Sequence, residues 1–135
     1  METHDTKLVG GSLGCRFDAA RPVLFVHGMW HAAWCWNEYF FDYFERRGLA
    51  AHALNLRGHG GRLTGPRSLR WTSLEDYVND VLEGVSRFRN PPVLVGHSLG
   101  CLLVEICLAR LRPPAAILLA PTRHGIFRRS TVGFF

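Results

Sequence analysis

The stretch VLVGHSLGCLL, residues 93–103, places one serine between two glycines at the junction of two apolar segments. The segment before the junction, residues 91–96, is short and rich in valine, which is typical of a strand buried on both faces. The segment after it, residues 99–110, is apolar almost all round, as expected of a helix pressed against a sheet. The pattern therefore predicts a strand that turns directly into a helix, with Ser98 at the turn.

The two glycines of this turn avoid a steric clash on either side of the serine. So sharp a turn crowds the residues two before and two after the serine, and Gly96 and Gly100 occupy those positions without side chains. The serine then projects at the carboxyl end of the sheet, where the N–H of Leu99 opens the helix and can meet an oxyanion. Because Gly-x-Ser-x-Gly recurs by chance, a tight glycine turn with an incidental serine is the alternative interpretation. The flanking strand and helix favour a catalytic nucleophile at Ser98.

A second short motif, HGMW at residues 27–30, ends the first apolar strand, residues 22–28. An acyl-transfer site needs a second N–H donor opposite the one at Leu99. A loop that leaves a neighbouring strand after Gly28 can offer the N–H of Met29 for this purpose. An ordinary strand-to-loop turn, with glycine present for a positive φ, is the alternative.

Outward from these motifs, strands and helices alternate along the chain. Thr72-Ser73-Leu74-Glu75 offers a capping box for a helix with apolar residues on one face and acids on the opposite face. The order predicts an α/β fold with a mostly parallel sheet flanked by helices, joined by right-handed crossovers. The predicted strands cover residues 22–28, 51–57, 91–96 and 115–121, and the predicted helices cover 34–48, 73–88 and 99–110.

Three segments together resemble the first half of an α/β-hydrolase: VLFVHGMWHAAWCW (23–36), NLRGHGG (55–61) and VGHSLG (95–100). Within that superfamily the chain is similar to small esterases and lysophospholipases with a helical cap, and HGMWHAAWCW also resembles plant methylesterases and hydroxynitrile lyases. The resemblance implies a serine hydrolase acting on carboxylic esters or related acyl compounds, with no metal and no other cofactor. The resemblance implies Ser98 as the nucleophile, the N–H groups of Met29 and Leu99 as oxyanion donors, and Gly96 and Gly100 as the elbow glycines of the turn that carries the nucleophile. It also suggests that Trp30 and His31 line the acyl pocket; the alternative is that these two residues only cover the edge of the sheet.

The triad of such enzymes follows the order serine, acid, histidine, and here the sequence departs from the pattern. After Ser98 the chain has one acid, Glu105, and one histidine, His124. Glu105 lies about two helical turns beyond the serine and cannot orient a base there. His27 and His97 match motif positions that usually serve packing and hydrogen bonding. We therefore expect the acid and base to be missing, and the fold to be truncated after the strand that follows the nucleophile helix.

The expected organisation is a poorly ordered lead-in at 1–21 with at most a short edge strand, a partial hydrolase domain at 22–121, and the start of a cap or linker at 122–135. The strand at 115–121 would form a bare apolar edge, so self-association through it is expected. His59, in the loop after the second buried strand, is expected at the pocket rim, where it contributes to substrate access rather than proton transfer; a solvated loop histidine is the alternative. A catalytically inactive hydrolase-like binding module, or a truncated gene product, is the alternative to an enzyme.

The amino-acid composition argues against several other classes of protein. The net charge of +5 comes from fifteen arginines and one lysine spread along the chain, which gives no basic patch for nucleic acid. The four cysteines show neither a Cys-x-x-Cys pair nor metal-ligand spacing, so reduced thiols are expected. No export signal or membrane span is visible, and a cytoplasmic protein with a small acyl substrate is expected.

Overall fold

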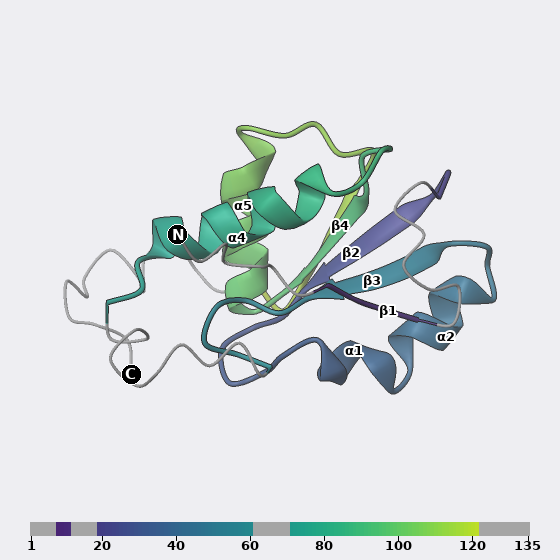
Figure 1. The fold of residues 1–135 in the computed structure, drawn as a ribbon, viewed down its shortest axis with the longest axis horizontal. Coiled ribbons are helices and arrows are strands. Elements are labelled where there is room, and N and C mark those ends of the chain that lie inside the picture. The colour runs from purple at the N-terminus through teal and green to yellow at the C-terminus, as the bar shows by residue number, and fades with distance from the viewer. Residues whose placement is uncertain (1–7, 12–18, 61–70, 122–135) are drawn as a thin grey trace.

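A five-stranded sheet in the order β1-β3-β2-β4-β5 forms the centre of the protein (Figure 1). The computed structural model describes residues 8–11, 19–60 and 71–121. The three inner contacts, β2 with β3, β2 with β4 and β4 with β5, are all parallel, and β1 pairs antiparallel with β3. The strands are β1 (Leu8–Gly10), β2 (Pro22–Val26), β3 (Ala50–Leu54), β4 (Val93–His97) and β5 (Ala116–Leu119).

The register brings the carboxyl ends of the parallel strands to one edge. Val26 at the end of β2 lies opposite Leu54 of β3 and Gly96 of β4, and His97 lies opposite Leu119 of β5. The loops that follow these strands therefore leave the sheet together, as the general rule for parallel α/β sheets requires of a binding edge. The segments that carry HGMW, RGHGG and the Ser98 turn meet there.

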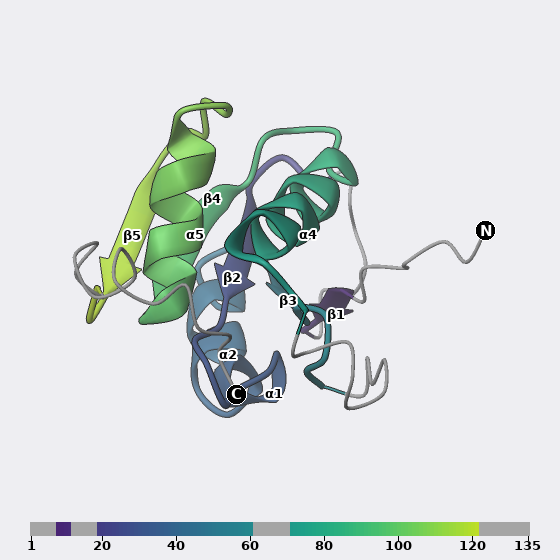
Figure 2. The same cartoon turned by 90° about the vertical axis from the view of Figure 1, so that its left-hand side faces the viewer.

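Helices cover both faces of the sheet (Figures 1 and 2). On one face, α4 (Leu74–Ser86) and α5 (Leu99–Leu108) pack against Leu24, Leu54 and Leu94. On the other face, α1 (Trp34–Asn37) and α2 (Phe40–Glu45) bring aromatic side chains onto Val23, Phe25 and Val95. Successive strand residues point to opposite faces, so β2 contributes to both cores and is fully buried. This confirms the predicted α/β architecture.

The predicted helix at 34–48 is two short helices, so that prediction was wrong. Tyr39 interrupts it with φ −134° and ψ −36°. The break follows from the aromatic residues that the segment must bury: the rings of Trp36, Phe40 and Phe44 lie 4.8, 5.9 and 5.2 Å from that of Phe25. Two short helices let rings from both segments reach Phe25.

The predicted start of α4 was also wrong, by one residue. Ser73, rather than Thr72, is the N-cap: its hydroxyl accepts from the Asp76 N–H at 3.1 Å, and the Asp76 carboxylate accepts from the Ser73 N–H at 2.7 Å. Asp76 also lies 3.3 Å from the Arg57 guanidinium. Because the N-cap is Ser73, the third helical residue is Asp76 rather than Glu75, and Asp76 closes the box.

The two edges of the sheet differ. β1 pairs along β3, with Leu8 opposite Leu54, which makes β1 the short edge strand expected near the start of the chain. At the other edge, β5 pairs only with β4 among the described strands, and Ile117 keeps 39% of its surface exposed. Residues 122–135, including His124, and Cys15 lie outside the described residues.

Candidate active site

The backbone of Ser98 takes a conformation that non-glycine residues rarely adopt, with φ 52° and ψ −116°. Holding a residue there costs on the order of 1–3 kcal/mol and requires support from its surroundings. Two hydrogen bonds give that support: the Ser98 N–H donates to Leu119 O at 3.1 Å, and the Cys101 N–H donates to Ser98 O at 3.0 Å. The strained serine thus sits between the end of β4 and the start of α5, where the sequence placed it.

The glycines on either side of Ser98 leave no room for side chains. A Cβ on Gly96 would lie 2.6 Å from Gly100 O, and one on Gly100 would lie 2.8 Å from His27 O and run into the Val26 carbonyl. The first turn of α5 therefore lies directly against the end of β2. Only glycine allows this contact, as the elbow prediction required.

The loop after β2 borders the serine. A Cβ placed on Gly28 would lie 2.9 Å from Ser98 Cβ, so the backbone of Gly28 touches the serine side chain. Met29 follows directly, half-buried against the core of α4 and α5. The next residue, Trp30, has φ 65° and exposes 75% of its surface. The structure therefore brings the loop of the predicted oxyanion donor beside Ser98.

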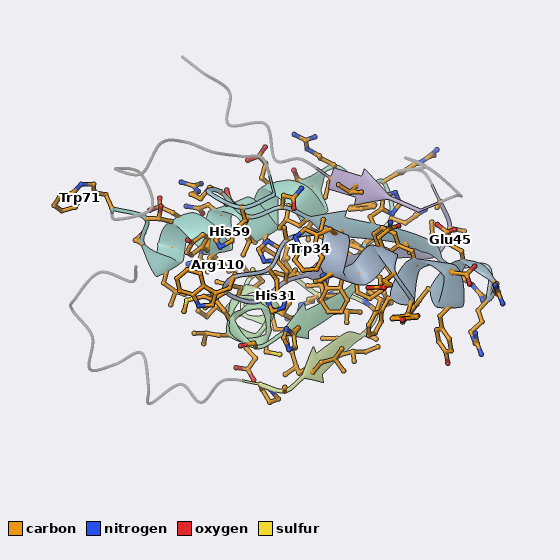
Figure 3. All side chains as sticks on the ribbon, turned by 90° about the horizontal axis from the view of Figure 1, so that it is seen from below. His31, Trp34, Glu45, His59, Trp71 and Arg110 are labelled. Carbon is orange, nitrogen blue, oxygen red and sulfur yellow. The ribbon has the colours of Figure 1, made fainter. Side chains whose placement is uncertain are left out.

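Aromatic and imidazole rings surround this edge (Figure 3). His31 is half-buried, and its ring lies 5.9 Å from that of Trp34 and 5.8 Å from that of His97. Its Nδ1 lies 3.0 Å from Met29 O. His31 thus belongs to the same loop as the predicted oxyanion donor, next to an exposed tryptophan that sequence reasoning did not single out.

Two further histidines lie at this edge. His27 is fully buried at the end of β2, and burial lowers its pKa to about 4, so the ring is neutral near pH 7. His59, on the loop after β3, is half-buried with its ring 5.1 Å from that of His27 and 6.2 Å from that of Tyr77. Its Nδ1 lies 3.0 Å from Arg57 O. The structure thus places His59 in the predicted loop.

Among the described carboxylates, Asp80 of α4 is buried near this edge, although the helical pattern predicted the acids of this helix on the face opposite its apolar residues. Asp80 is fully buried. Arg57 binds it through the backbone N–H at 2.8 Å and through the guanidinium at 2.8 Å. The hydrogen bond to Asp80 is the main cause that raises the pKa of Arg57. Glu105, the other acid considered, lies in α5 seven residues after Ser98.

Sequence reasoning also missed Asn55. Its side-chain oxygen, buried at the end of β3, accepts a hydrogen bond from the Ala33 N–H at 2.8 Å. The contact joins the loops after β2 and β3 across 22 residues of sequence. The glycines of RGHGG were the available signal, since a Cβ on Gly60 would collide with the Asn55 side chain.

Within the described ranges, no three histidine, cysteine or carboxylate side chains are grouped so as to hold a metal ion. The helices of the described residues include none long and apolar enough to cross a membrane.

These features define a class: a mostly parallel α/β sheet with a strained serine between β4 and α5. A family model described as the alpha/beta hydrolase family matches residues 23–135, and the chain belongs to this family. The expectation drawn from the three sequence motifs is thereby confirmed.

Two curated proteins illustrate the relationship. "Probable esterase PIR7A" from Oryza sativa subsp. indica is 34% identical over 107 residues, which are 76% of this chain and 40% of that protein. Methylesterase 9 from Arabidopsis thaliana is 33% identical over 82 residues, 59% of this chain and 31% of that protein. The chain thus spans about 40% of the length of the rice relative.

Among solved structures, the epoxide hydrolase VrEH1 from Vigna radiata superposes with a TM-score of 0.68 at 24% identity. The match covers 87% of this chain and 38% of that one. At this identity the likeness shows the fold alone.

Proposed function

We propose that this chain carries the nucleophile and oxyanion loop of a serine hydrolase that acts on carboxylic esters or related acyl compounds. The observation that carries the proposal is the backbone of Ser98, held at φ 52° between two glycines and against Gly28. Strain of this kind is retained where the surroundings impose it, and it presents the serine hydroxyl at the edge of the sheet. The names of the relatives, an esterase and a methylesterase, favour small ester substrates.

In the proposed reaction the Ser98 Oγ bonds to the carbonyl carbon while the carbonyl π electrons move onto oxygen. The N–H groups of Met29 and Leu99 stabilise that oxyanion, and the start of α5 adds a positive electrostatic potential. When the intermediate collapses, the bond to the leaving oxygen breaks, and this oxygen takes up the proton removed from Ser98 and departs as the alcohol. Water then attacks the acyl serine, which releases the carboxylic acid and restores the Ser98 hydroxyl. The exposed rings of Trp30 and Trp34, with His31 between them, offer an apolar rim for the acyl group.

A base must take the Ser98 proton. Asp80 is held by Arg57, Glu105 lies within α5, and His27 is buried with a low pKa, so none of the three is assigned as acid or base. We expect the chain by itself to hydrolyse esters no faster than its Ser98→Ala variant. Without the triad partners, oxyanion stabilisation and binding leave about 10³- to 10⁴-fold catalysis over water in well-studied serine enzymes.

A fluorophosphonate probe, which reacts with activated serines, tests the proposal without requiring turnover. The labelling rate is measured from pH 6 to pH 10 on the whole chain, on Ser98→Ala, and on Ser86→Ala as a matched control for an exposed serine. The proposal predicts labelling that depends on Ser98, is unaffected in Ser86→Ala, and rises about tenfold per pH unit because hydroxide from the solvent acts as the base.

Two outcomes would contradict parts of this account. A plateau in the labelling rate near pH 7 would reveal an internal histidine base. Absence of Ser98-dependent labelling at every pH, in protein shown to be folded, would overturn the hydrolase assignment and favour a binding module.

We also propose that the outer edge of β5, which no other described strand covers, promotes self-association. Ala116 and Ile117 are exposed there, and no charged side chain lies on the strand. An apolar edge without charge or proline is a template for pairing with another chain.

A further inference from the structure

The ring of His27 makes two buried hydrogen bonds to backbone groups of two different loops. Its Nδ1 lies 2.7 Å from Gly28 O in the loop after β2, and its Nε2 lies 3.2 Å from Leu56 N in the loop after β3. Both loops border the edge that carries Ser98. Burial requires partners for both ring nitrogens, and here the two partners are backbone groups of the two loops that border the serine.

The partners of the ring fix its tautomer. A backbone N–H can only donate, so Nε2 must accept from Leu56 N–H and carries no proton. The neutral ring then holds its proton on Nδ1, which donates to Gly28 O, a group that can only accept. Both bonds are satisfied by one tautomer of the neutral ring and by no other protonation state.

The carbonyl that His27 holds belongs to the same peptide unit as the N–H of Met29. A trans peptide is planar, and its C=O and N–H point in opposite directions. With the Gly28 carbonyl fixed on the His27 ring, the Met29 N–H is turned away from that ring. Because the backbone of Gly28 touches the Ser98 side chain, this peptide borders the serine.

We propose that His27 is a positioning residue for the oxyanion loop: through Leu56 N–H and Gly28 O, its ring orients the Gly28–Met29 peptide so that the Met29 N–H serves Ser98. The inference rests on the proposed function for its catalytic meaning. His27 does not touch the reacting atoms and acts only through the Gly28–Met29 peptide.

Contacts beyond the ring hold this arrangement from both sides. Arg57, the residue after Leu56, is fixed to buried Asp80 through its backbone and its guanidinium, which anchors the loop after β3 to α4. At the far end of the oxyanion loop, Ala33 N–H donates to Asn55 at 2.8 Å. His31 N–H also donates to Gly28 O, at 3.4 Å. The oxyanion loop is thus tied to the loop after β3 at both of its ends.

Two substitutions separate the two bonds of the ring. In His27→Asn the side-chain NH₂ occupies the place of Nδ1 and can still donate to Gly28 O, but nothing reaches Leu56. In His27→Gln the side-chain oxygen takes the place of Nε2 and can still accept from Leu56 N–H, but the donor to Gly28 O is lost. The proposal predicts that asparagine largely rescues the peptide orientation and that glutamine does not.

The orientation is measured by NMR on the whole chain, from the residual dipolar coupling of the Met29 N–H, with the Ala33 N–H as an internal control. In the wild-type protein at pH 7, the imidazole nitrogens of His27 are expected to show a proton on Nδ1 and none on Nε2. The Met29 coupling is expected to stay near the wild-type value in His27→Asn and to change in His27→Gln, while the Ala33 coupling stays constant in both.

A proton on Nε2 in the wild-type protein would overturn the proposal, and this measurement needs no variant to fold. A Met29 coupling unchanged in His27→Gln would overturn it as well. Fluorophosphonate labelling of Ser98 separates the two claims: in His27→Gln the rate should fall by about 10²-fold, the effect of losing one oxyanion donor. If the couplings behave as expected but the wild-type serine never reacts, the proposed function fails and the positioning geometry stands.

Discussion

Removal of the Arg57 guanidinium should destabilise the protein far more than removal of an exposed arginine. Arg57→Ala removes the guanidinium that pairs with the carboxylate of Asp80, which is fully buried. Breaking a buried ion pair by removing one partner costs about 3–5 kcal/mol. Arg57 keeps 23% of its side-chain surface exposed, and its backbone N–H at 2.8 Å would still bind Asp80, so we expect a loss at or below the lower end of this range, about 2–3 kcal/mol.

Urea denaturation followed by tryptophan fluorescence measures this difference in the free energy of unfolding. Arg46→Ala is the matched control, because its ion pair with Asp42 on α2 is mostly exposed and contributes about 0–0.5 kcal/mol. Asp80→Asn should fall between the two, since Arg57 can turn its charge to solvent while the amide still accepts from Arg57 N–H. The reasoning is refuted if Arg57→Ala costs no more than Arg46→Ala.

Three further predictions concern the turn, the buried histidine and the open edge. Gly100→Ala should lower the free energy of unfolding by about 3 kcal/mol, because its Cβ collides with the carbonyl of the facing β2 residue, and a loss below about 1 kcal/mol in urea denaturation would contradict the packing described. In the folded state the pKa of His27 is about 4, below the ordinary value of 6.5. Between these two pH values the unfolded state binds more protons than the folded state, so the free energy of unfolding should fall as the pH drops from 6.5 through 4. The shift in the pKa of His27 corresponds to about 3 kcal/mol of folding stability. The charges of His59 and His31 act in the same direction, because they also disfavour a proton on His27. This contribution to the pH dependence of denaturation should be absent in His27→Asn. Ile117→Lys should reduce self-association in sedimentation velocity, whereas Leu108→Lys, equally exposed at 40% but on α5, should not; equal effects of the two would remove the β5 edge as the cause.

Much of the fold followed from the sequence because its apolar segments are long and cleanly bounded. Residues 22–28 and 91–96 had to be strands buried on both faces, and parallel strands deliver their loops to one edge. The meeting of Gly28 with Ser98 followed from that rule. The split of the helix at 34–48 did not, because the gathering of aromatic rings on Phe25 depends on where β2 lies in the sheet.

The hydrogen bonds that hold the site together could not be predicted from local sequence patterns. Asp80 is polar at a position of α4 that faces the core, and Arg57, 23 residues earlier, folds back onto it and binds its carboxylate. The tautomer of His27 likewise depends on Leu56 N–H, which is 29 residues away and is placed by the register of β2 with β3. Such contacts arise from tertiary structure, so a sequence pattern of one strand or helix cannot show them.

The crystal structure of the chain after phosphonylation of Ser98 tests the central claim most directly. The account predicts a phosphonyl oxygen about 2.7–3.1 Å from both Met29 N and Leu99 N, with His27 Nδ1 still on Gly28 O. A phosphonyl oxygen directed into solvent, or bound to donors other than these two N–H groups, would contradict it.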